Sequence, residues 1–178
     1  MAEDLVIRPE RAADHDAIAQ VVRAAFVEHP DEVATFVERI RASEQYIPEL
    51  ALVAEDDSGV IAHVMLSWVG VEGGSRPRIL CLTPMSVRPD RQRRGVGSWL
   101  IRDVLGRAEA AGEPAVFLEG IPDYYPRFGF EPARALGLEP PDPWPSENWL
   151  ALRLPAWDAS VRGLVHFPPA FATGQPER

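Results

Sequence analysis

The pattern of apolar and polar positions changes period along the chain, and each period predicts a different kind of element. The first apolar run, "LVIRPE", predicts a short strand at residues 5–10. Two stretches with helical spacing follow, and we expect Asp14 to cap the first while Asp31 lies near the start of the second. Their apolar faces consist of Ile18, Val21, Val22 and Ala25, and of Val33, Phe36, Val37 and Ile40.

Three β-rich segments come next in the sequence. They are "LALVAED" (50–56), "GVIAHVMLSWVGV" (59–71) and "RILCLTPMSV" (78–87). The connections "DDSG" and "EGGSRP" contain the turn residues expected between antiparallel neighbours. The sequence therefore predicts a three-stranded meander.

Helical spacing returns with a row formed by Val96, Leu100, Val104 and Ala108, and Gly112 with Pro114 ends this helix. The apolar run "AVFLEG" (115–120) is typical of a buried strand. Together with residues 78–87 it predicts a strand-helix-strand crossover at the centre of the molecule. Further on we expect a broken helical turn at "PDYYPRFGF", a proline-rich loop at "LEPPDPWPSEN", a strand at "WLALRL", an apolar piece at "GLVHFPP" and a frayed tail.

Composition limits the class of protein. A chain of 178 residues with 46% hydrophobic residues is long enough for one domain with a real core. The net charge of -9 disfavours a nucleic-acid binder, because affinity for a phosphate backbone comes mainly from many basic contacts. We also expect a cytoplasmic protein without a secretory signal or membrane span, in which Cys81 is a buried small hydrophobe. Four scattered histidines give no metal-ligand spacing, so we expect no metal.

The stretch "RQRRGVGSWL" (91–100) opens the third long helix without a capping side chain. The free N–H groups of such a helix start favour an anion, and Gly95 and Gly97 allow a phosphate to approach the backbone. Arg93 and Arg94 add positive charge. The alternative is a helix whose glycines pack on the sheet and whose arginines are solvated. The sequence lacks a P-loop and a complete dinucleotide-binding fingerprint.

Two segments carry a resemblance to a known family. "LTPMSVRPDRQRRGVGSWLI" resembles motif A of the GCN5-related N-acetyltransferase (GNAT) family, and "YYPRFGF" resembles its Y-x-x-x-G-F element. The resemblance covers about residues 5–155 and is strongest to the bacterial YhbS-like predicted acetyltransferases. The agreeing residues are Val87, Pro89, Gln92, Gly95, Gly97 and Leu100 in the first segment, and Tyr125, Gly129 and Phe130 in the second.

The resemblance implies an α/β (α+β) fold in one domain over residues 1–178, with a core at 5–155 and an extension at 156–178. Its sheet would be mixed and mostly antiparallel, with a splayed central pair of parallel strands and helices on both faces. Acetyl-coenzyme A would lie in the gap of that pair, and we expect Pro84 to mark where the ladder opens. The implied coenzyme-binding residues are Met85, Ser86, Val87, Gln92, Arg93, Arg94, Gly95, Val96, Gly97, Ser98 and Tyr124.

The implied activity is direct transfer of an acetyl group to a primary amine. Tyr125 matches the family tyrosine that protonates the departing thiolate. We rank Glu119 first as the base, with Asp123, His63 and Glu72 as alternatives, and each also has an ordinary structural explanation. The family's Asn-x-x-Ala element is missing here, and two prolines restrict the tyrosine segment to about one turn.

The acceptor is less defined. The resemblance places it between the first two helices and the loop near residues 136–148, where acidic and aromatic residues favour a cationic acceptor or simply form an acidic surface. Those residues are Glu139, Asp142, Trp144, Glu147 and Trp149. An acyl-coenzyme A-binding regulatory protein is the alternative function, and a nucleic-acid module built on the arginines is disfavoured by the net acidity. Homodimerisation is left open.

Overall fold

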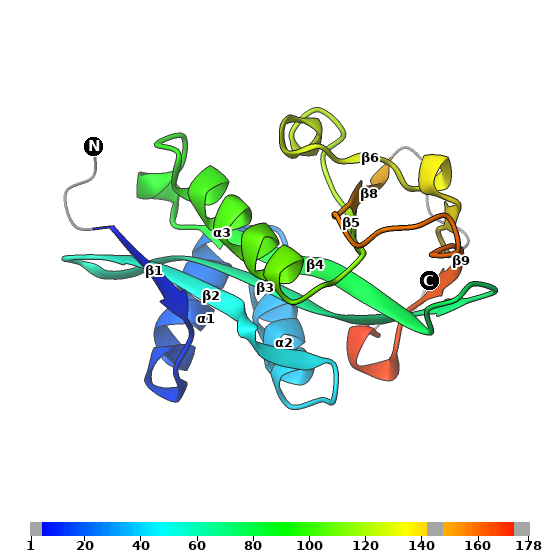
Figure 1. Cartoon of the computed structure of the whole chain (residues 1–178). Helices are drawn as coiled ribbons and strands as arrows, with labels where there is room; N and C mark the ends of the chain where they lie inside the picture. The colour runs from blue at the N-terminus through cyan, green and yellow to red at the C-terminus, as the bar shows by residue number, and fades with distance from the viewer. Residues whose placement is uncertain (1–4, 142–147, 173–178) are drawn as a thin grey trace.

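The computed structural model describes residues 5–141 and 148–172, and it is built around one mixed sheet with helices on both faces (Figure 1). The helices are α1 (His15–Ala25), α2 (Pro30–Arg41) and α3 (Val96–Ala110). The strands are β1 (Val6–Pro9), β2 (Tyr46–Asp56), β3 (Gly59–Glu72), β4 (Arg78–Val87), β5 (Ala115–Glu119), β6 (Glu131–Pro132), β7 (Leu138–Glu139), β8 (Trp149–Arg153) and β9 (Gly163–His166).

The order of strands confirms the predicted fold class. The main path of the sheet is β1-β2-β3-β4-β5-β8-β6, and β9 pairs with β3 and β7. Neighbours along that path are antiparallel except for β4 and β5, which run parallel. The meander and the strand-helix-strand crossover are therefore both present, and α3 is the crossover helix.

The two faces of the sheet are covered by different helices (Figure 1). On one face, Leu100, Ile101 and Val104 of α3 are fully buried in a cluster with apolar side chains of β2, β3 and β4. On the other face, the buried side chains of α1 and α2 pack against alternate residues of β2 and β3. The apolar positions with helical spacing in the sequence thus form the faces of the helices that pack on the sheet.

The parallel pair separates part-way along β4. Its register contains only Leu80 with Val116 and Cys81 with Phe117 among the described residues, although β4 continues to Val87. The ladder between β3 and β4 is also irregular here, because its register shifts between the pairs that flank Thr83 and Pro84. Proline has no N–H to donate to a ladder. The predicted opening is present, but it begins directly after Cys81 and thus before Pro84, where the sequence placed it. Cys81 is buried as expected.

Several local predictions need correction. The expected side-chain cap of Asp14 on α1 is wrong, because its carboxylate instead accepts the Arg11 N–H at 2.7 Å and binds Arg8 at 2.7 Å. The strands β6 and β7 were not expected, and the piece around "GLVHFPP" contributes β9 to the sheet. Asp142, Trp144, Glu147 and the tail from residue 173 lie outside the described residues. Among those described, no helix is long and apolar enough to cross a membrane.

Candidate coenzyme and acceptor site

The N-terminus of α3 is open to a ligand. Gly95 precedes the helix with a φ of 87°, in the left-handed region that favours glycine, and no side chain from the described chain caps the first turn. That turn also contains no acidic residue. The first N–H groups of the helix therefore keep their donor capacity and the positive end of the helix dipole.

The turn before α3 is fixed to the end of β4. The Gln92 side-chain amide donates to the carbonyl of Val87 at 3.0 Å. Arg88 and Arg91 are occupied in ion pairs, with Asp90 at 2.6 Å and with Asp56 at 2.9 Å respectively. Arg93, by contrast, lines the adjoining cavity and forms no ion pair with the described residues. Its guanidinium is available to an anion.

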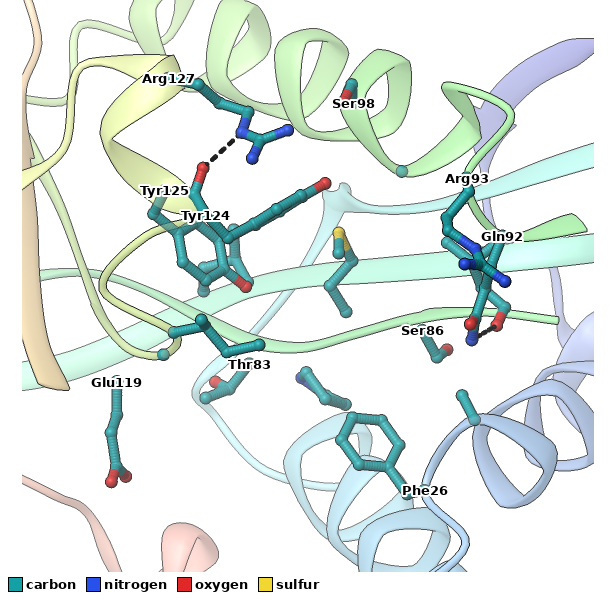
Figure 2. Close-up of a pocket in the computed structure, with 18 of the residues that line it drawn as sticks. Phe26, Thr83, Ser86, Gln92, Arg93, Ser98, Glu119, Tyr124, Tyr125 and Arg127 are labelled. Carbon is teal, nitrogen blue, oxygen red and sulfur yellow. Dashed lines mark hydrogen bonds between the residues drawn. The ribbon is translucent and has the colours of Figure 1, made fainter. Parts of the chain in front are cut away.

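A cavity of about 1020 Å³ extends from this turn along the gap between β4 and β5 (Figure 2). Its volume slightly exceeds the range of about 300–1,000 Å³ that is usual for drug-sized ligands, which suits a long coenzyme. Most of the predicted site residues line it, namely Met85, Ser86, Val87, Gln92, Arg93, Gly95, Gly97, Ser98, Glu119, Tyr124 and Tyr125.

Two tyrosines enter the cavity in different directions (Figure 2). The Tyr124 hydroxyl reaches the first turn of α3, where it would lie 3.5 Å from a Cβ built on Gly97. Tyr125 lies against Gly120, since a Cβ there would come within 2.4 Å of its ring, and it packs edge-on against Phe130. Burial, with a smaller effect of Tyr124, raises the pKa of Tyr125 to about 12. The Tyr125 hydroxyl thus remains protonated at neutral pH and can act as a proton donor.

Glu119 ends β5 at the other end of the cavity. Figure 2 shows its carboxylate on the side of β4 where Phe26 also lies. Burial raises the pKa of this carboxyl above its usual value. An adjoining cavity of about 390 Å³ shares Glu119, Gly120 and Ile121 with the first. The larger cavity therefore has a basic end at α3 and an acidic end at β5.

The remaining predicted residues lie elsewhere. Arg94 does not line the cavity, and the Val96 side chain is buried in the core beneath α3. The alternative bases Asp123 and Glu72 are exposed outside the cavity, and His63 is completely buried. No group of metal-ligating side chains was found among the residues that the structure describes.

Comparison with known proteins agrees with this geometry. The family model described as an acetyltransferase (GNAT) domain matches residues 6–133. The chain belongs to the GNAT family. It is 31% identical to the uncharacterized N-acetyltransferase YjhQ of Escherichia coli over 154 residues, which cover 84% of this chain and 83% of that protein.

Two solved GNAT structures are also similar. One is YhbS from Escherichia coli in complex with CoA, with a TM-score of 0.85, 30% identity and coverage of 96% of this chain and 93% of that chain. The other is a GNAT family acetyltransferase from Brucella melitensis in complex with acetyl-CoA, with a TM-score of 0.77, 31% identity and coverage of 95% and 99%. The resemblance to the YhbS-like branch is thereby confirmed.

Sequence reasoning missed seven cavity residues, namely Ala25, Phe26, Leu82, Thr83, Gly120, Ile121 and Arg127. Phe26 directly follows the last residue of α1, and Ile121 is 69% exposed beside Glu119. The position of Phe26, an apolar residue immediately after a helix, could have marked it as a candidate lining residue. Nothing in the local sequence marks the other missed residues as part of a site. They line one cavity because β4 and β5 separate.

Proposed function

We propose that this GNAT protein is an acetyl-CoA-dependent N-acetyltransferase that acts on a primary amine by direct transfer in a ternary complex. The observation that carries the proposal is the uncapped start of α3, which opens onto the gap where β4 and β5 separate. A helix N-terminus is suited to a pyrophosphate, and an unpaired strand edge is suited to the amides of a pantetheine arm.

The coenzyme would extend from α3 to the centre of the sheet. Its pyrophosphate would accept hydrogen bonds from the backbone between Gly95 and Ser98, with the Arg93 guanidinium beside it. The pantetheine would follow the unpaired edge of β4 from Val87 to Met85. The related proteins solved with CoA and acetyl-CoA support this class of ligand.

When the acceptor arrives as an ammonium, its nitrogen loses two protons, the second of them to water, and the departing sulfur gains one, in addition to the attack of nitrogen on the thioester carbon. A backbone N–H of the segment Met85–Val87 would stabilise the oxyanion. Tyr125 would donate a proton to the departing sulfur: its hydroxyl is protonated at neutral pH, and its raised pKa makes it a weaker acid than an ordinary tyrosine. Glu119 would take the first proton from the ammonium form of the acceptor.

The acceptor would enter next to Glu119, Phe26 and Ile121. Glu119 is the only carboxylate among the described residues that line the larger cavity. A carboxylate beside apolar side chains favours an ammonium group attached to an apolar body, because the charge and the hydrophobic surface are both matched.

Release of coenzyme A thiol from acetyl-CoA in the presence of a panel of primary amines tests the function. We expect amine-dependent release by the wild-type protein and none by Gly97→Glu. Saturable binding of acetyl-CoA without release for any amine would instead support the acyl-coenzyme A-binding regulatory protein, and no binding at all would contradict both functions.

A further inference from the structure

Arg127 is a basic residue of the large cavity to which the proposed function assigns no role. It belongs to the short 3-10 helix Tyr125–Phe128. Arg93 and Arg127 are the two basic residues among the described residues that line this cavity. Figure 2 shows the Arg127 side chain on the side of β4 where α3 lies, whereas the Glu119 carboxylate lies on the other side. Arg127 therefore faces the part of the cavity that would hold the coenzyme.

Two contacts with the preceding tyrosine fix the position of the Arg127 guanidinium. Its Nε–H donates to the carbonyl of Tyr124 at 2.8 Å, and its central carbon lies 4.5 Å from the centre of the Tyr124 ring (Figure 2). The hydroxyl of the same ring reaches the first turn of α3, beside Gly97. One aromatic ring thus connects the guanidinium to the helix start that would hold the pyrophosphate. A side chain held in this way loses little further freedom when it binds a ligand.

The terminal nitrogens of Arg127 keep their hydrogen-bonding capacity. The Tyr124 carbonyl takes the N–H on Nε, which leaves the N–H groups on Nη1 and Nη2. Neither of these two nitrogens forms a hydrogen bond or an ion pair with any residue that the structure describes. They form a planar fork that matches the oxygens of a phosphate. Arg127 is therefore ready to bind an anionic ligand in the cavity.

The charge around Arg127 also favours an anion. Neither the first turn of α3 nor the first turn of the helix Tyr125–Phe128 contains an acidic residue. Figure 2 shows Arg93 and Arg127 on either side of Ser98, which lies at the start of α3. In a protein with a net charge of -9, two arginines that lack ion pairs in the described structure concentrate positive potential at this end of the cavity.

We infer that Arg127 binds a phosphate of the coenzyme and faces Arg93 across the start of α3. This inference rests on the coenzyme site of the proposed function. The candidate ligands are the pyrophosphate, which the backbone between Gly95 and Ser98 would also contact, and the 3′-phosphate of the ribose. Both present the same oxygens to a guanidinium fork. Arg127 is a binding residue in this scheme and takes no part in the proton transfers.

Arg127→Gln tests the contact, and Arg102→Gln is the matched control. Arg102 is an exposed arginine of α3 whose guanidinium lies 5.4 Å from the centre of the Phe128 ring, but it does not line the cavity. Arg127 is exposed as well, so we expect both variants to fold as the wild type does. Calorimetric titration should show that Arg127→Gln binds CoA about 10-fold more weakly at low ionic strength and that Arg102→Gln binds it normally. Added salt should reduce the difference.

Truncated coenzymes identify the phosphate that Arg127 contacts. Dephospho-CoA keeps the pyrophosphate and lacks the 3′-phosphate. If Arg127 binds the 3′-phosphate, the wild type and Arg127→Gln should bind dephospho-CoA equally well. If Arg127 binds the pyrophosphate, the loss of about 10-fold should persist with dephospho-CoA.

A donor without any phosphate separates this contact from a structural role. With S-acetylpantetheine and the fastest amine of the panel, we expect the same kcat/KM for the wild type and Arg127→Gln, because this donor has no phosphate to bind. An arginine that only held Tyr124 in place would be needed for S-acetylpantetheine as much as for acetyl-CoA.

Two results would overturn the role of Arg127 and leave the proposed function intact. One is equal affinity of the wild type and Arg127→Gln for CoA. The other is an equal loss of kcat/KM in Arg127→Gln with S-acetylpantetheine and with acetyl-CoA. A wild-type protein that binds neither CoA nor acetyl-CoA would instead contradict the proposed function itself.

Discussion

The Tyr124 hydroxyl and the α-carbon of Gly97 face each other so closely that a Cβ on Gly97 would lie 3.5 Å from the hydroxyl oxygen. The same Cβ would lie 3.4 Å from the Val87 side chain. Gly97 lines the cavity at the first turn of α3, and a larger residue at position 97 would occupy the space proposed for the coenzyme.

Gly97→Glu is expected to weaken binding of acetyl-CoA by at least about 100-fold, or about 2.7 kcal/mol, through steric overlap and repulsion of the pyrophosphate. Gly106→Glu on the same helix is the matched control, because Gly106 has open space around it and lies outside the cavity. Calorimetric titration compares the two variants. Equal affinities would mean that the coenzyme does not use the start of α3.

Tyr125→Phe is expected to lower kcat by about 100-fold or more while changing the affinity for acetyl-CoA little, because general acid catalysis contributes to the transition state. Tyr124→Phe, whose hydroxyl reaches α3, should mainly change coenzyme affinity. Steady-state kinetics with calorimetry separates the effects. A loss of kcat in Tyr124→Phe with no loss in Tyr125→Phe would mean that Tyr124, and not Tyr125, is the proton donor.

Glu119→Gln is expected to lower turnover and to remove the acidic limb of its pH profile. A raised pKa means that Glu119 keeps its proton to a higher pH than an ordinary glutamate at about 4.3, so the wild-type rate should fall with decreasing pH above that value. Glu72→Gln, exposed outside the cavity, should preserve the profile. If the acidic limb persists in Glu119→Gln, a group other than Glu119 takes the first proton from the acceptor.

Glu10→Gln is expected to lower the free energy of unfolding at pH 7 by about 3–5 kcal/mol, because it removes the buried carboxylate that Arg41 contacts and leaves this arginine only its half-exposed partner Glu38. The pKa of Glu10 is depressed in the folded state, so its contribution is complete above the unfolded value of about 4.3 and is lost as the pH falls below it. Chemical denaturation at several pH values measures this. The control Asp31→Asn, in an exposed ion pair with Arg23, should change stability by at most about 1 kcal/mol.

Helices and strands with a clear period of apolar positions were predictable, because the side chains that they bury follow that period. Leu100 and Val104 are buried under α3 as the spacing indicated, and the register shift between β3 and β4 falls at Pro84, which has no N–H to donate. The strands β6 and β7 have two residues each, which is too short for a period. The Asp14 cap failed because Arg8 binds the same carboxylate, and this arginine approaches from a different element.

The candidate site was predictable where it is contiguous in the sequence. Residues 85–98 and 119–125 supplied most of the lining, whereas Phe26 and the buried contacts of Glu10 with Arg41 and His63 depend on long-range strand pairing. Glu10, Arg41 and His63 come from three distant segments, and no local pattern links them. The cytoplasmic location stays a prediction from the sequence, and homodimerisation stays open.

A crystal structure of the wild-type protein with bound CoA would show whether the coenzyme uses the start of α3 and the gap between β4 and β5. We expect a pyrophosphate held by the backbone N–H groups between Gly95 and Ser98, and a pantetheine arm between β4 and β5 with its sulfur near Tyr125. A coenzyme bound elsewhere, or β4 and β5 paired through Val87 with no ligand between them, would contradict it.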